Sequence, residues 1–418
     1  MVGTMAKIDD SVKKKVPELR FKGFTDEWEE RKLGDIFVYK QGQQVPVENQ
    51  FTKRGKNRHR FIRIVDLTTN NEAPRYIEYS GDNIISSTDL FMIRYGQPGV
   101  IGYGYEGVIA NNLFKLIPKI ETYNLFFKYI LDSMYPKIQS LSSSTTMPAI
   151  SFKSLDVLAV RYPDKKEQEK IGSFFAQLDN TIALHQRKLD LLKEQKKGYL
   201  QKMFPKAGEK IPELRFAGFA DDWEERKFKD IIEKLTGGAS IKPSDYLEEG
   251  IRTIPKGAVN STGLADLSGS KYISEEFYES NKSSHVSTNN LVTSLRDLVP
   301  SAPNMGRIVR IAGEDEDFLM PQGVYKLELF DGMDEEFLIA FSNSDKYRKI
   351  ISSEKNGSTQ VHIRNGEFLN IDIELPFSEE QKQIGSFFKQ LDNSIALHQH
   401  KLDLLKEQKK GFLQKMFV

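Results

Sequence analysis

Two stretches of the chain carry apolar residues at alternating intervals of four and three, the spacing that predicts a coiled-coil helix. In the first stretch the seam consists of Ile171, Phe175, Leu178, Ile182, His185, Leu189, Leu192, Lys196, Tyr199 and Met203. In the second it consists of Ile384, Phe388, Leu391, Ile395, His398, Leu402, Leu405, Lys409, Phe412 and Met416. We therefore expect two long helices, each about 60 Å long at about 1.5 Å per residue.

Residues that start or stop helices mark the ends of both stretches. Asp164 with Glu167, and Ser378 with Gln381, have the spacing of a capping box, and Pro205 follows the first helix. Two equal helices in one chain can bury their seams against each other. A two-fold relation between the halves of the chain makes this pair antiparallel.

The seams also contain polar residues at matching places, namely His185 with His398 and Lys196 with Lys409. Polar residues in a seam commonly set the register and orientation of the helices, and this is the interpretation we prefer. Two histidines without other converging ligands give little support to a metal site.

The helices belong to the longer of two internal repeats. Residues 171–204 and 384–417 differ at only four positions: Ala176/Lys389, Thr181/Ser394, Arg187/His400 and Tyr199/Phe412. A shorter repeat, VPELRFKGFTDEWEERKLGDI at 16–36, returns as IPELRFAGFADDWEERKFKDI at 211–231. Near-identical frames thus enclose two inserts, 37–163 and 232–376, which show no obvious similarity.

Each insert is expected to mix strands and helices. Runs rich in β-branched and aromatic residues predict strands at 60–67, 89–96 and 155–162, and at 306–313, 323–329 and 369–375. Helices are predicted at 121–138 and 333–351. Both inserts end in a strand, a proline and the long helix, so we hypothesise that they share one fold.

Several apolar residues lie on the long helices but outside the seams: Phe174, Leu184, Leu191, Leu200, Phe387, Leu397, Leu404 and Leu413. A two-stranded coiled coil leaves such residues in water. Either the adjoining domains or partner helices cover them. The duplication of the surface favours two identical partners, one for each half of the chain.

Polar loops between the predicted strands carry side chains that can contact DNA, since arginine, asparagine, glutamine and hydroxyl residues can read base edges. In the first insert the candidates are Lys53, Arg54, Lys56, Arg58, Arg60, Thr68, Thr69, Asn70, Arg94, Tyr95, Gln97, Ser144, Thr145 and Thr146. In the second they are Lys256, Asn260, Ser261, Arg296, Ser301, Asn304, Arg307, Ser358, Thr359 and Gln360. The basic tract from Lys53 to Arg60 is either a solvated surface loop or a loop that follows phosphates.

Composition narrows the chemistry further. The net charge is +1, so any basic surface must be local, and the absence of cysteine excludes disulfides and thiolate chemistry. We find no metalloprotease, serine-hydrolase, P-loop or amino-methyltransferase motif, and the Gly-rich stretch 96–107 is interpreted as hairpin turns. No apolar run approaches the length of a membrane span, and no secretory signal is present. A cytoplasmic protein that is not itself an enzyme is expected.

These features together resemble the specificity subunits of type I restriction–modification systems. The resemblance covers nearly the whole chain, through two dissimilar inserts, the PELRF-GF-WEERK-DI segments that open each half, and the IGSFF…LDN…I entry into each long helix. It implies an α+β fold in which two mixed α/β target-recognition domains are joined by two long, near-identical helices. These helices would form an antiparallel coiled coil, in a pseudo-two-fold circular arrangement.

On this resemblance the chain divides into six parts: a tail with the first short repeat (1–36), target-recognition domain 1 (37–163), long helix 1 (164–204), a linker with the second short repeat (205–231), target-recognition domain 2 (232–376) and long helix 2 (377–418).

The resemblance also implies partners. Each target-recognition domain would read one half of a split, asymmetric site in double-stranded DNA, with the helices setting the unread gap. Two methylation subunits carrying S-adenosylmethionine would bind this chain, and restriction subunits using ATP and Mg²⁺ would join them. No cofactor is expected in the chain itself.

Two other functions stay open at this point. The chain could be a complete modification enzyme, although the missing methyltransferase motifs argue against this. It could also be a coiled-coil scaffold that binds proteins without DNA specificity, and a salt-dependent affinity for DNA would exclude that interpretation.

Overall fold

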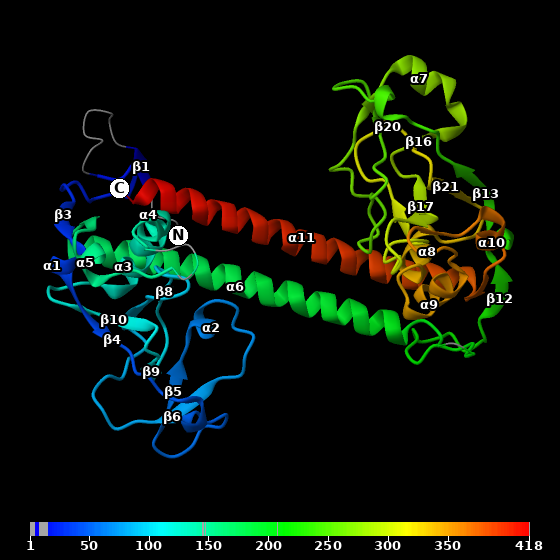
Figure 1. The fold of residues 1–418 in the computed structure, drawn as a ribbon. Coiled ribbons are helices and arrows are strands. Elements are labelled where there is room, and N and C mark those ends of the chain that lie inside the picture. Colours follow the sequence, from blue (N-terminus) through cyan, green and yellow to red (C-terminus); the bar gives the residue numbers. More distant parts are fainter. Residues whose placement is uncertain (1–4, 8–15, 144–145, 147, 207, 418) are drawn as a thin grey trace. The chain divides into compact units, whose positions relative to one another are not determined.

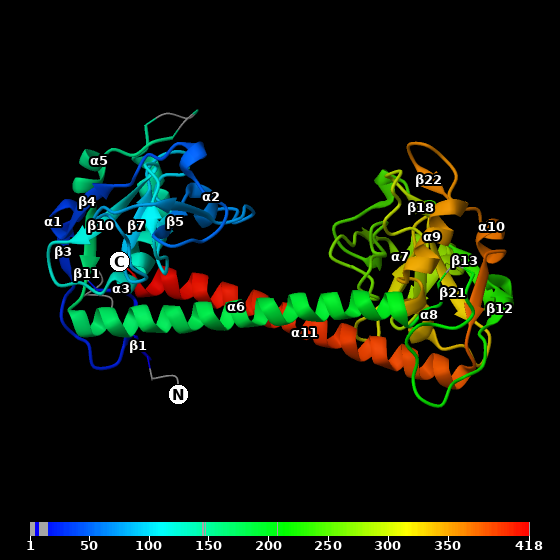
Figure 2. The ribbon, with the colours of Figure 1, turned by 90° about the horizontal axis from the view of Figure 1, so that it is seen from below.

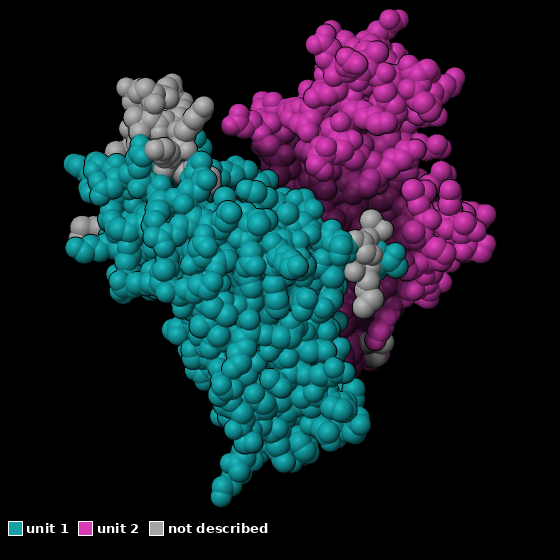
Figure 3. Space-filling model, turned by 60° about the vertical axis from the view of Figure 1, so that its left-hand side comes forward, with its two compact units in different colours: residues 1–185, 401–418 teal, residues 186–400 magenta. Residues whose placement is uncertain are grey.

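The computed structural model describes residues 5–7, 16–143, 146, 148–206 and 208–417. These residues form two compact units, shown in different colours in Figure 3. Unit 1 comprises residues 1–185 and 401–418, and unit 2 comprises residues 186–400. Each unit therefore contains one insert and a part of both long helices.

Unit 1 combines short strands with short helices (Figure 1). Its strands are β1 (Met5–Lys7), β2 (Leu19–Phe21), β3 (Glu29–Lys32), β4 (Phe37–Gln41), β5 (Arg58–Ile62), β6 (Arg75–Glu78), β7 (Leu90–Ile93), β8 (Ile101–Gly102), β9 (Val108–Ile109), β10 (Leu113–Pro118) and β11 (Ala159–Tyr162). Its helices, besides the long ones, are α1 (Leu33–Ile36), η2 (Val47–Asn49), α2 (Ile64–Leu67), α3 (Asn124–Ser133), α4 (Tyr135–Ser140) and α5 (Phe152–Asp156).

Unit 2 is built from the same kinds of element. Its strands are β12 (Glu224–Lys227), β13 (Ile232–Gly237), β14 (Ile251–Thr253), β15 (Tyr272–Ile273), β16 (His285–Ser287), β17 (Leu291–Ser294), β18 (Arg296–Asp297), β19 (Ile308–Arg310), β20 (Asp317–Leu319), β21 (Val324–Leu329), β22 (Val361–His362) and β23 (Asp372–Leu375). Its helices, besides the long ones, are η3 (Phe228–Asp230), η4 (Pro243–Asp245), α7 (Glu275–Ser280), η5 (Lys282–Ser284), α8 (Glu335–Phe341), α9 (Asp345–Glu354) and α10 (Asn365–Leu369).

The sheets of the two units have corresponding strand orders. The four-stranded sheet β4-β10-β7-β8 of unit 1 matches β13-β21-β17-β19 of unit 2. The second sheet is β6-β5-β9 in unit 1 and β15-β14-β20-β16 in unit 2, and each contains one parallel pair, β5 with β9 and β14 with β20. The two inserts therefore share one topology despite their dissimilar sequences. The place of β16 is taken in unit 1 by an isolated antiparallel bridge between Ile85 and Gly107.

Local hydrogen bonds explain where the predicted elements were too long. The strand predicted at 60–67 ends at Ile62, and the following residues form α2, because the Asp66 carboxylate accepts a hydrogen bond from the Arg63 N–H at 2.8 Å and starts a turn. The helix predicted at 333–351 is two helices, α8 and α9. Its break falls at Ser344, whose hydroxyl accepts the N–H of Tyr347 and caps α9.

The two long helices are α6 (Lys165–Lys202) and α11 (Ser378–Met416). In unit 1, Phe174 near the start of α6 packs against Phe412 near the end of α11, with ring centroids 5.2 Å apart. In unit 2, Tyr199 near the end of α6 packs against Phe387 near the start of α11, at 4.9 Å. The helices thus run antiparallel where they pack within each unit, as predicted (Figures 1 and 2).

The seam lysines form ion pairs between these helices. Lys196 Nζ lies 2.5 Å from an Asp392 carboxylate oxygen in unit 2, and Lys409 Nζ lies 2.5 Å from an Asp179 oxygen in unit 1. Asp179 also accepts a hydrogen bond from the Tyr129 hydroxyl at 2.8 Å. Because each lysine meets a specific carboxylate, these pairs favour a single register of the helices.

Both long helices begin at the predicted places, but only one of the predicted capping residues acts as a cap. The Asp164 carboxylate accepts the N–H of Glu167 at 3.0 Å and caps α6. Ser378 is the first residue of α11, and its hydroxyl donates to the Gly332 carbonyl at 3.0 Å. The side chain of Gln381 is occupied elsewhere, since it donates to the Pro376 carbonyl at 2.9 Å, so no capping box forms there.

Each unit has its own aromatic core, and the ends of the long helices contribute to it. In unit 1, Phe175 of α6 stacks on Phe417, which follows the end of α11, at 5.6 Å. In unit 2, Phe388 of α11 stacks on Phe204, which follows the end of α6, at 5.8 Å. Among the described residues, no helix has the length and apolar character needed to cross a membrane.

Candidate nucleic-acid interface

Three of the polar loops predicted in the first insert meet at one edge of unit 1. The N–H of Gly96, in the loop after β7, donates to the Pro148 carbonyl at 2.9 Å, and Tyr95 forms an isolated bridge with Ala149. A Cβ placed on Gly96 would lie 3.8 Å from the Cδ1 of Ile64, at the start of α2. Ile64, residues 95–96 and residues 148–149 are therefore neighbours.

Arg94 ties these loops together from within. Its guanidinium donates to the Gln41 side-chain oxygen at 2.8 Å and to the Ile150 carbonyl at 3.2 Å. The same group lies over the Phe152 ring at 4.4 Å and over the Tyr95 ring at 5.0 Å. Arg94 is thus held by contacts within the unit. Its partner Gln41 was not predicted from the sequence, because no motif around Gln41 indicates a functional residue.

The basic tract divides into an exposed part and an anchored part. Lys53, Arg54 and Lys56 are exposed. Arg58 lies over the Phe51 ring at 3.4 Å, and Arg60 pairs with Asp66 at 3.2 Å. The cations that can approach a phosphate without breaking these contacts are therefore the first three.

The other candidates of unit 1 lie near the loop edge. The Thr68 hydroxyl donates to the Ile64 carbonyl at 3.0 Å, and that of Thr69 donates to the Asn71 side chain at 2.7 Å. Asn70 has a left-handed φ of 47°, a conformation that asparagine tolerates better than most residues. Gln97 and Thr146 are exposed, while Ser144 and Thr145 lie outside the described residues.

In unit 2, two groups of candidates come together at the corresponding place. Arg296 of β18 pairs with His362 of β22, which brings the loop after β17 beside residues 356–362. Ser301, Ser358, Thr359 and Gln360 are exposed there, and Asn304 is half-buried. This arrangement matches the bridge between Tyr95 and Ala149 in unit 1.

A third group lies against the long helix instead. Lys196 of α6 donates to the Ser261 carbonyl at 3.4 Å. The Asn260 amide donates to the carbonyls of Ala258 and Leu264 at 3.1 and 3.0 Å, which closes the turn. Lys256, in the same loop, is exposed.

Arg307 is half-buried together with a residue that sequence reasoning missed, Arg348 of α9. The Arg307 guanidinium donates to the Pro303 carbonyl at 2.9 Å and also bonds the Asn343 side chain. Burial, with a smaller contribution from Arg348, lowers the pKa of Arg307 to about 10. The predicted helix 333–351 gave no sign that Arg348 would turn toward this loop.

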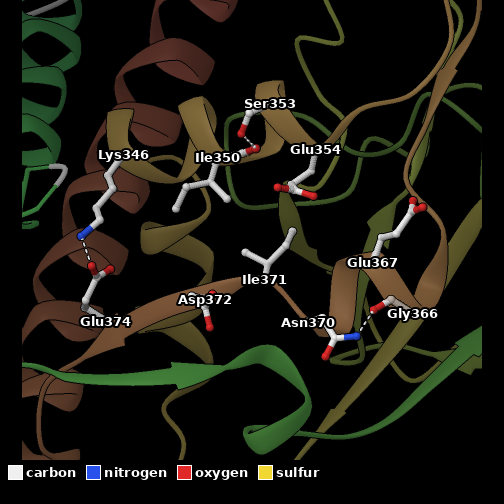
Figure 4. A pocket seen from close by; sticks show the side chains of 10 residues that line it. All are labelled: Lys346, Ile350, Ser353, Glu354, Gly366, Glu367, Asn370, Ile371, Asp372 and Glu374. Carbon is white, nitrogen blue, oxygen red and sulfur yellow. Dashed lines mark hydrogen bonds and ion pairs between the residues drawn. The ribbon is translucent and has the colours of Figure 1, made fainter.

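A cavity of about 660 Å³ opens between α9, α10 and β23 in unit 2 (Figure 4). Lys346 pairs with Glu374 at one side of it, and Glu354, Glu367 and Asp372 also line it. This excess of carboxylates does not suit a phosphate. Among the described residues, no group of three or more histidine, aspartate or glutamate side chains is placed to hold a metal ion.

The apolar residues outside the seams fall into two classes. Phe174 and Leu413 pack against the core of unit 1, and Leu200 and Phe387 against that of unit 2. The remaining four are exposed in this chain: Leu184, Leu191, Leu397 and Leu404. Intrachain contacts thus cover half of the predicted partner surface and leave the other half open.

Sequence comparison places this architecture in a family. The family described as "Type I restriction modification DNA specificity domain" matches residues 25–194 and 220–407, which is most of the chain. The chain belongs to this family. It is the DNA specificity subunit of a type I restriction–modification system and is not itself catalytic.

Individual relatives agree with the family assignment. The specificity subunit is 22% identical over 399 residues to the type I restriction enzyme MjaVIII specificity subunit of Methanocaldococcus jannaschii, covering 93% of this chain and 91% of the relative. It is 24% identical over 206 residues to the putative MjaX specificity subunit of the same organism, covering 47% and 46%. The crystal structure of the S subunit from M. genitalium has the same fold, with a TM-score of 0.65 and 15% identity, over 96% of this chain and 99% of that one.

Proposed function

We propose that this specificity subunit reads a split, asymmetric DNA site, with one half-site contacted by each unit. The main support for this proposal is that the two units share one sheet topology but have different loops. In both units the polar loop that follows β7 or β17 lies beside a second polar loop of the same unit. A shared framework with different loop side chains suits two domains that perform the same task on different sequences.

Binding to the DNA backbone would rest on a local surface. The chain's net charge of +1 offers no general attraction for phosphates. Lys53, Arg54 and Lys56 are exposed on one loop of unit 1, and they can neutralise phosphates without losing intrachain contacts. Each such contact contributes to affinity and to its salt dependence, whereas base contacts set the sequence.

We further propose that two methylation subunits dock on the exposed leucines of the long helices. Leu184 and Leu404 are exposed in unit 1, and Leu191 and Leu397 are exposed in unit 2. Gly198 and Gly411 occupy equivalent positions seven residues beyond Leu191 and Leu404, and nothing lies within 4 Å of a Cβ built on either. A helical glycine in open space costs about 1 kcal/mol, and the close approach of a partner explains its presence in both copies.

The methylation subunits would carry S-adenosylmethionine, and the restriction subunits that join them would use ATP and Mg²⁺. This chain would supply only recognition and assembly. That division agrees with the absence of methyltransferase and P-loop motifs from its sequence.

The test of DNA reading is a segment exchange. The chain is expressed with its cognate methylation subunit, and adenine methylation is mapped across a test genome. We expect one split motif with two different halves. Replacing residues 232–376 with the insert of another specificity subunit should change one half of the motif and leave the other half and the gap intact. Change in both halves, or no methylation by an assembled complex, would contradict the proposal and favour a protein scaffold.

The docking surface is tested by charge substitution. Leu191→Glu and Leu404→Glu occupy equivalent places, so each single variant should bind one methylation subunit and the double variant none, as measured by the mass of the purified complex. Leu247→Glu is the matched control, since Leu247 is an exposed leucine of unit 2 outside the long helices. A double variant that still binds two subunits would exclude this surface.

A further inference from the structure

The loop that follows β17 in unit 2 is longer than its counterpart in unit 1. Residues 295–307 connect β17 to β19, whereas residues 94–100 connect the equivalent strands β7 and β8. The two loops start at the same place in the shared topology and thus occupy equivalent positions. The longer loop is exposed for much of its length, although its backbone is held unusually closely by the helix beside it.

Arg348 of α9 binds three carbonyl groups of this loop. Its guanidinium donates to Met305 at 2.6 Å, to Ala302 at 3.0 Å and to Pro303 at 3.2 Å. Arg307 donates to the same Pro303 carbonyl at 2.9 Å. A planar guanidinium can satisfy several acceptors in fixed directions, so this arrangement specifies the course of the backbone.

Two further side chains of the same region extend the network. The Tyr347 hydroxyl donates to the Gly306 carbonyl at 2.6 Å, and Lys355 Nζ donates to the Pro300 carbonyl at 2.7 Å. A Cβ on Gly306, whose φ is 74°, would lie 2.7 Å from the Cδ1 of Ile351. Five carbonyls between residues 300 and 306 are therefore held by side chains from α9, its C-terminal flank and the loop itself.

This network holds the loop in a conformation that is unfavourable by itself. Ala302 has a left-handed φ of 48°, which costs an L-residue with a Cβ on the order of 1 kcal/mol. Its side chain is nevertheless buried. The loop is thus ordered before any ligand arrives, and a ligand that binds it need not supply the free energy of ordering.

The ordered loop presents apolar side chains to solvent. Leu298 is 74% exposed and Val299 is 46% exposed, beside the exposed Ser301 and Arg296. At this exposure the Leu298 side chain contributes little packing to the loop. On the edges of base pairs in the major groove, the apolar group available for contact is the 5-methyl group of thymine.

The same construction recurs in unit 1 with different residues. The Gln139 amide of α4 donates to the Pro98 carbonyl at 2.8 Å. A Cβ on Gly99, whose φ is 94°, would lie 2.8 Å from the Cγ2 of Ile138. The exposed residues of that loop are Gly96 and the polar Gln97. Both units thus brace the loop after the central strand, and they differ in what the loop presents.

We propose that loop 295–307 is a preorganised base-reading element of unit 2, in which Leu298 contacts a thymine methyl group and Arg348 is a positioning residue. This inference rests on the proposed DNA-reading function. It goes beyond it by naming the loop, the base and the chemical group that are read.

The first experiment substitutes Leu298 in the complex with the methylation subunit. Methylation rates are measured on a DNA library randomised across both half-sites. Leu298→Ala should reduce the preference for thymine at one position of the half-site read by unit 2 by about fourfold, the effect of losing roughly one buried methylene. Phe330→Ala is the control, because Phe330 is exposed at the opposite end of the same sheet, next to Leu329, which pairs with Ile232. An unchanged profile for Leu298→Ala would overturn the proposal.

A second measurement isolates the methyl group. Replacing the thymine at that position by deoxyuridine removes the methyl group and nothing else from the base pair. The wild-type complex should lose about as much affinity as Leu298→Ala loses on thymine DNA, and the variant should lose no more on deoxyuridine DNA. If the affinity losses from Leu298→Ala and from deoxyuridine were additive, Leu298 and the methyl group would not be in contact.

Arg348→Lys tests the positioning role. One ammonium group cannot replace a guanidinium that binds three carbonyls in fixed directions. The variant should weaken base preference in the half-site of unit 2 and leave the preferences and affinity at the half-site of unit 1 unchanged. An equal loss at both half-sites, or none, would overturn the role of Arg348.

A wild-type complex without a split motif would contradict the proposed function itself, whereas a normal motif with an inert Leu298→Ala would contradict only this inference.

Discussion

Arg20 and Arg215 occupy the same place in the two copies of the short repeat, and each forms a bidentate ion pair with a buried glutamate. In unit 1, the Arg20 guanidinium bonds both oxygens of Glu167 at 2.6 and 2.7 Å, with side-chain exposures of 3% and 0%. In unit 2, Arg215 bonds both oxygens of Glu380 at the same distances. Each pair fastens the PELRF segment to the first turn of a long helix.

Removal of one partner from such a pair should be costly. Arg20→Ala leaves the Glu167 carboxylate buried without a counter-charge, so we expect a loss of about 3–5 kcal/mol in the free energy of unfolding of unit 1. Arg31→Ala is the control, because Arg31 pairs with Glu29 at the surface and should contribute less than about 1 kcal/mol. Urea unfolding of both variants measures the difference. Equal effects would show that the buried pair has no special weight.

The orientation of single side chains could not be predicted from the sequence. The residue type and loop position of Arg94 and Arg307 indicate possible contacts with bases. In the structure, the Arg94 guanidinium donates to Gln41, which is far away in the sequence. The Arg307 guanidinium donates to the carbonyl of Pro303, and nothing in the sequence distinguishes this loop residue as a partner. Long-range hydrogen bonds decide whether an arginine faces a ligand or its own chain.

At the scale of elements, glycines in the long helices have two different roles. Gly172 and Gly385 lie where another helix begins against them. A Cβ on Gly385 would lie 2.2 Å from the Asp334 carboxylate and 2.6 Å from the Phe337 nitrogen, and one on Gly172 would lie 3.0 Å from the Phe126 nitrogen. Close packing therefore requires glycine at these two places. No such crowding surrounds Gly198 and Gly411.

Alanine substitutions should separate these roles. Gly385→Ala must displace α8, so it should destabilise unit 2 by about 1–3 kcal/mol in spite of the better helix propensity of alanine. Gly198→Ala meets no neighbour and should stabilise the isolated chain by up to about 1 kcal/mol. Urea denaturation of the free subunit gives both values. If Gly385→Ala were stabilising, the close approach of α8 to α11 would be wrong.

Elements with a strong internal repeat were predicted best. The seam residues recur over more than four heptads. The prediction of a helix therefore rests on many residues, and one position that breaks the pattern does not change it. Short elements such as α2 depend on a single side-chain bond, that of Asp66 to the Arg63 N–H, which periodicity does not reveal. The break between α8 and α9 is of the same kind.

At the scale of the whole molecule, each unit is completed by a helix end that comes from the other half of the sequence. Met416 and Phe417 are buried in the core of unit 1, where Phe417 lies 6.4 Å from Trp28. Phe204 has the equivalent place in unit 2, at 6.1 Å from Trp223. The chain thus closes unit 1 with its last residues and unit 2 with residues near its middle.

The two tryptophans allow this arrangement to be tested, since the chain has one in each core. Phe417→Ala should destabilise unit 1 by about 3–5 kcal/mol. In a Trp223→Phe background, Trp28 fluorescence should therefore report unfolding at a lower urea concentration. In a Trp28→Phe background, Trp223 should report a smaller change. Phe204→Ala should reverse the pattern. Equal shifts from both tryptophans would contradict separate cores.

A second prediction at this scale concerns the length of the long helices. If they set the unread gap of the DNA site, duplicating one heptad in both helices preserves the seam and adds about 10 Å. The gap should then lengthen by about three base pairs, at about 3.4 Å each, or the complex should lose activity because the half-sites are rotated. Mapping of the methylated motif checks this. An unchanged gap in an active complex would exclude the helices as the ruler.

The sequence by itself determined the repeated architecture, the two long helices and their antiparallel pairing, and through family resemblance the role of the chain in DNA recognition. Those features follow from local periodicity and from near-identical segments, and predicting them does not require knowing which distant residues are in contact. Only the tertiary structure decided which loops lie together, that α9 braces the loop after β17, and which off-seam leucines stay exposed. Such features depend on hydrogen bonds and packing between residues far apart in the chain, and no local pattern encodes them.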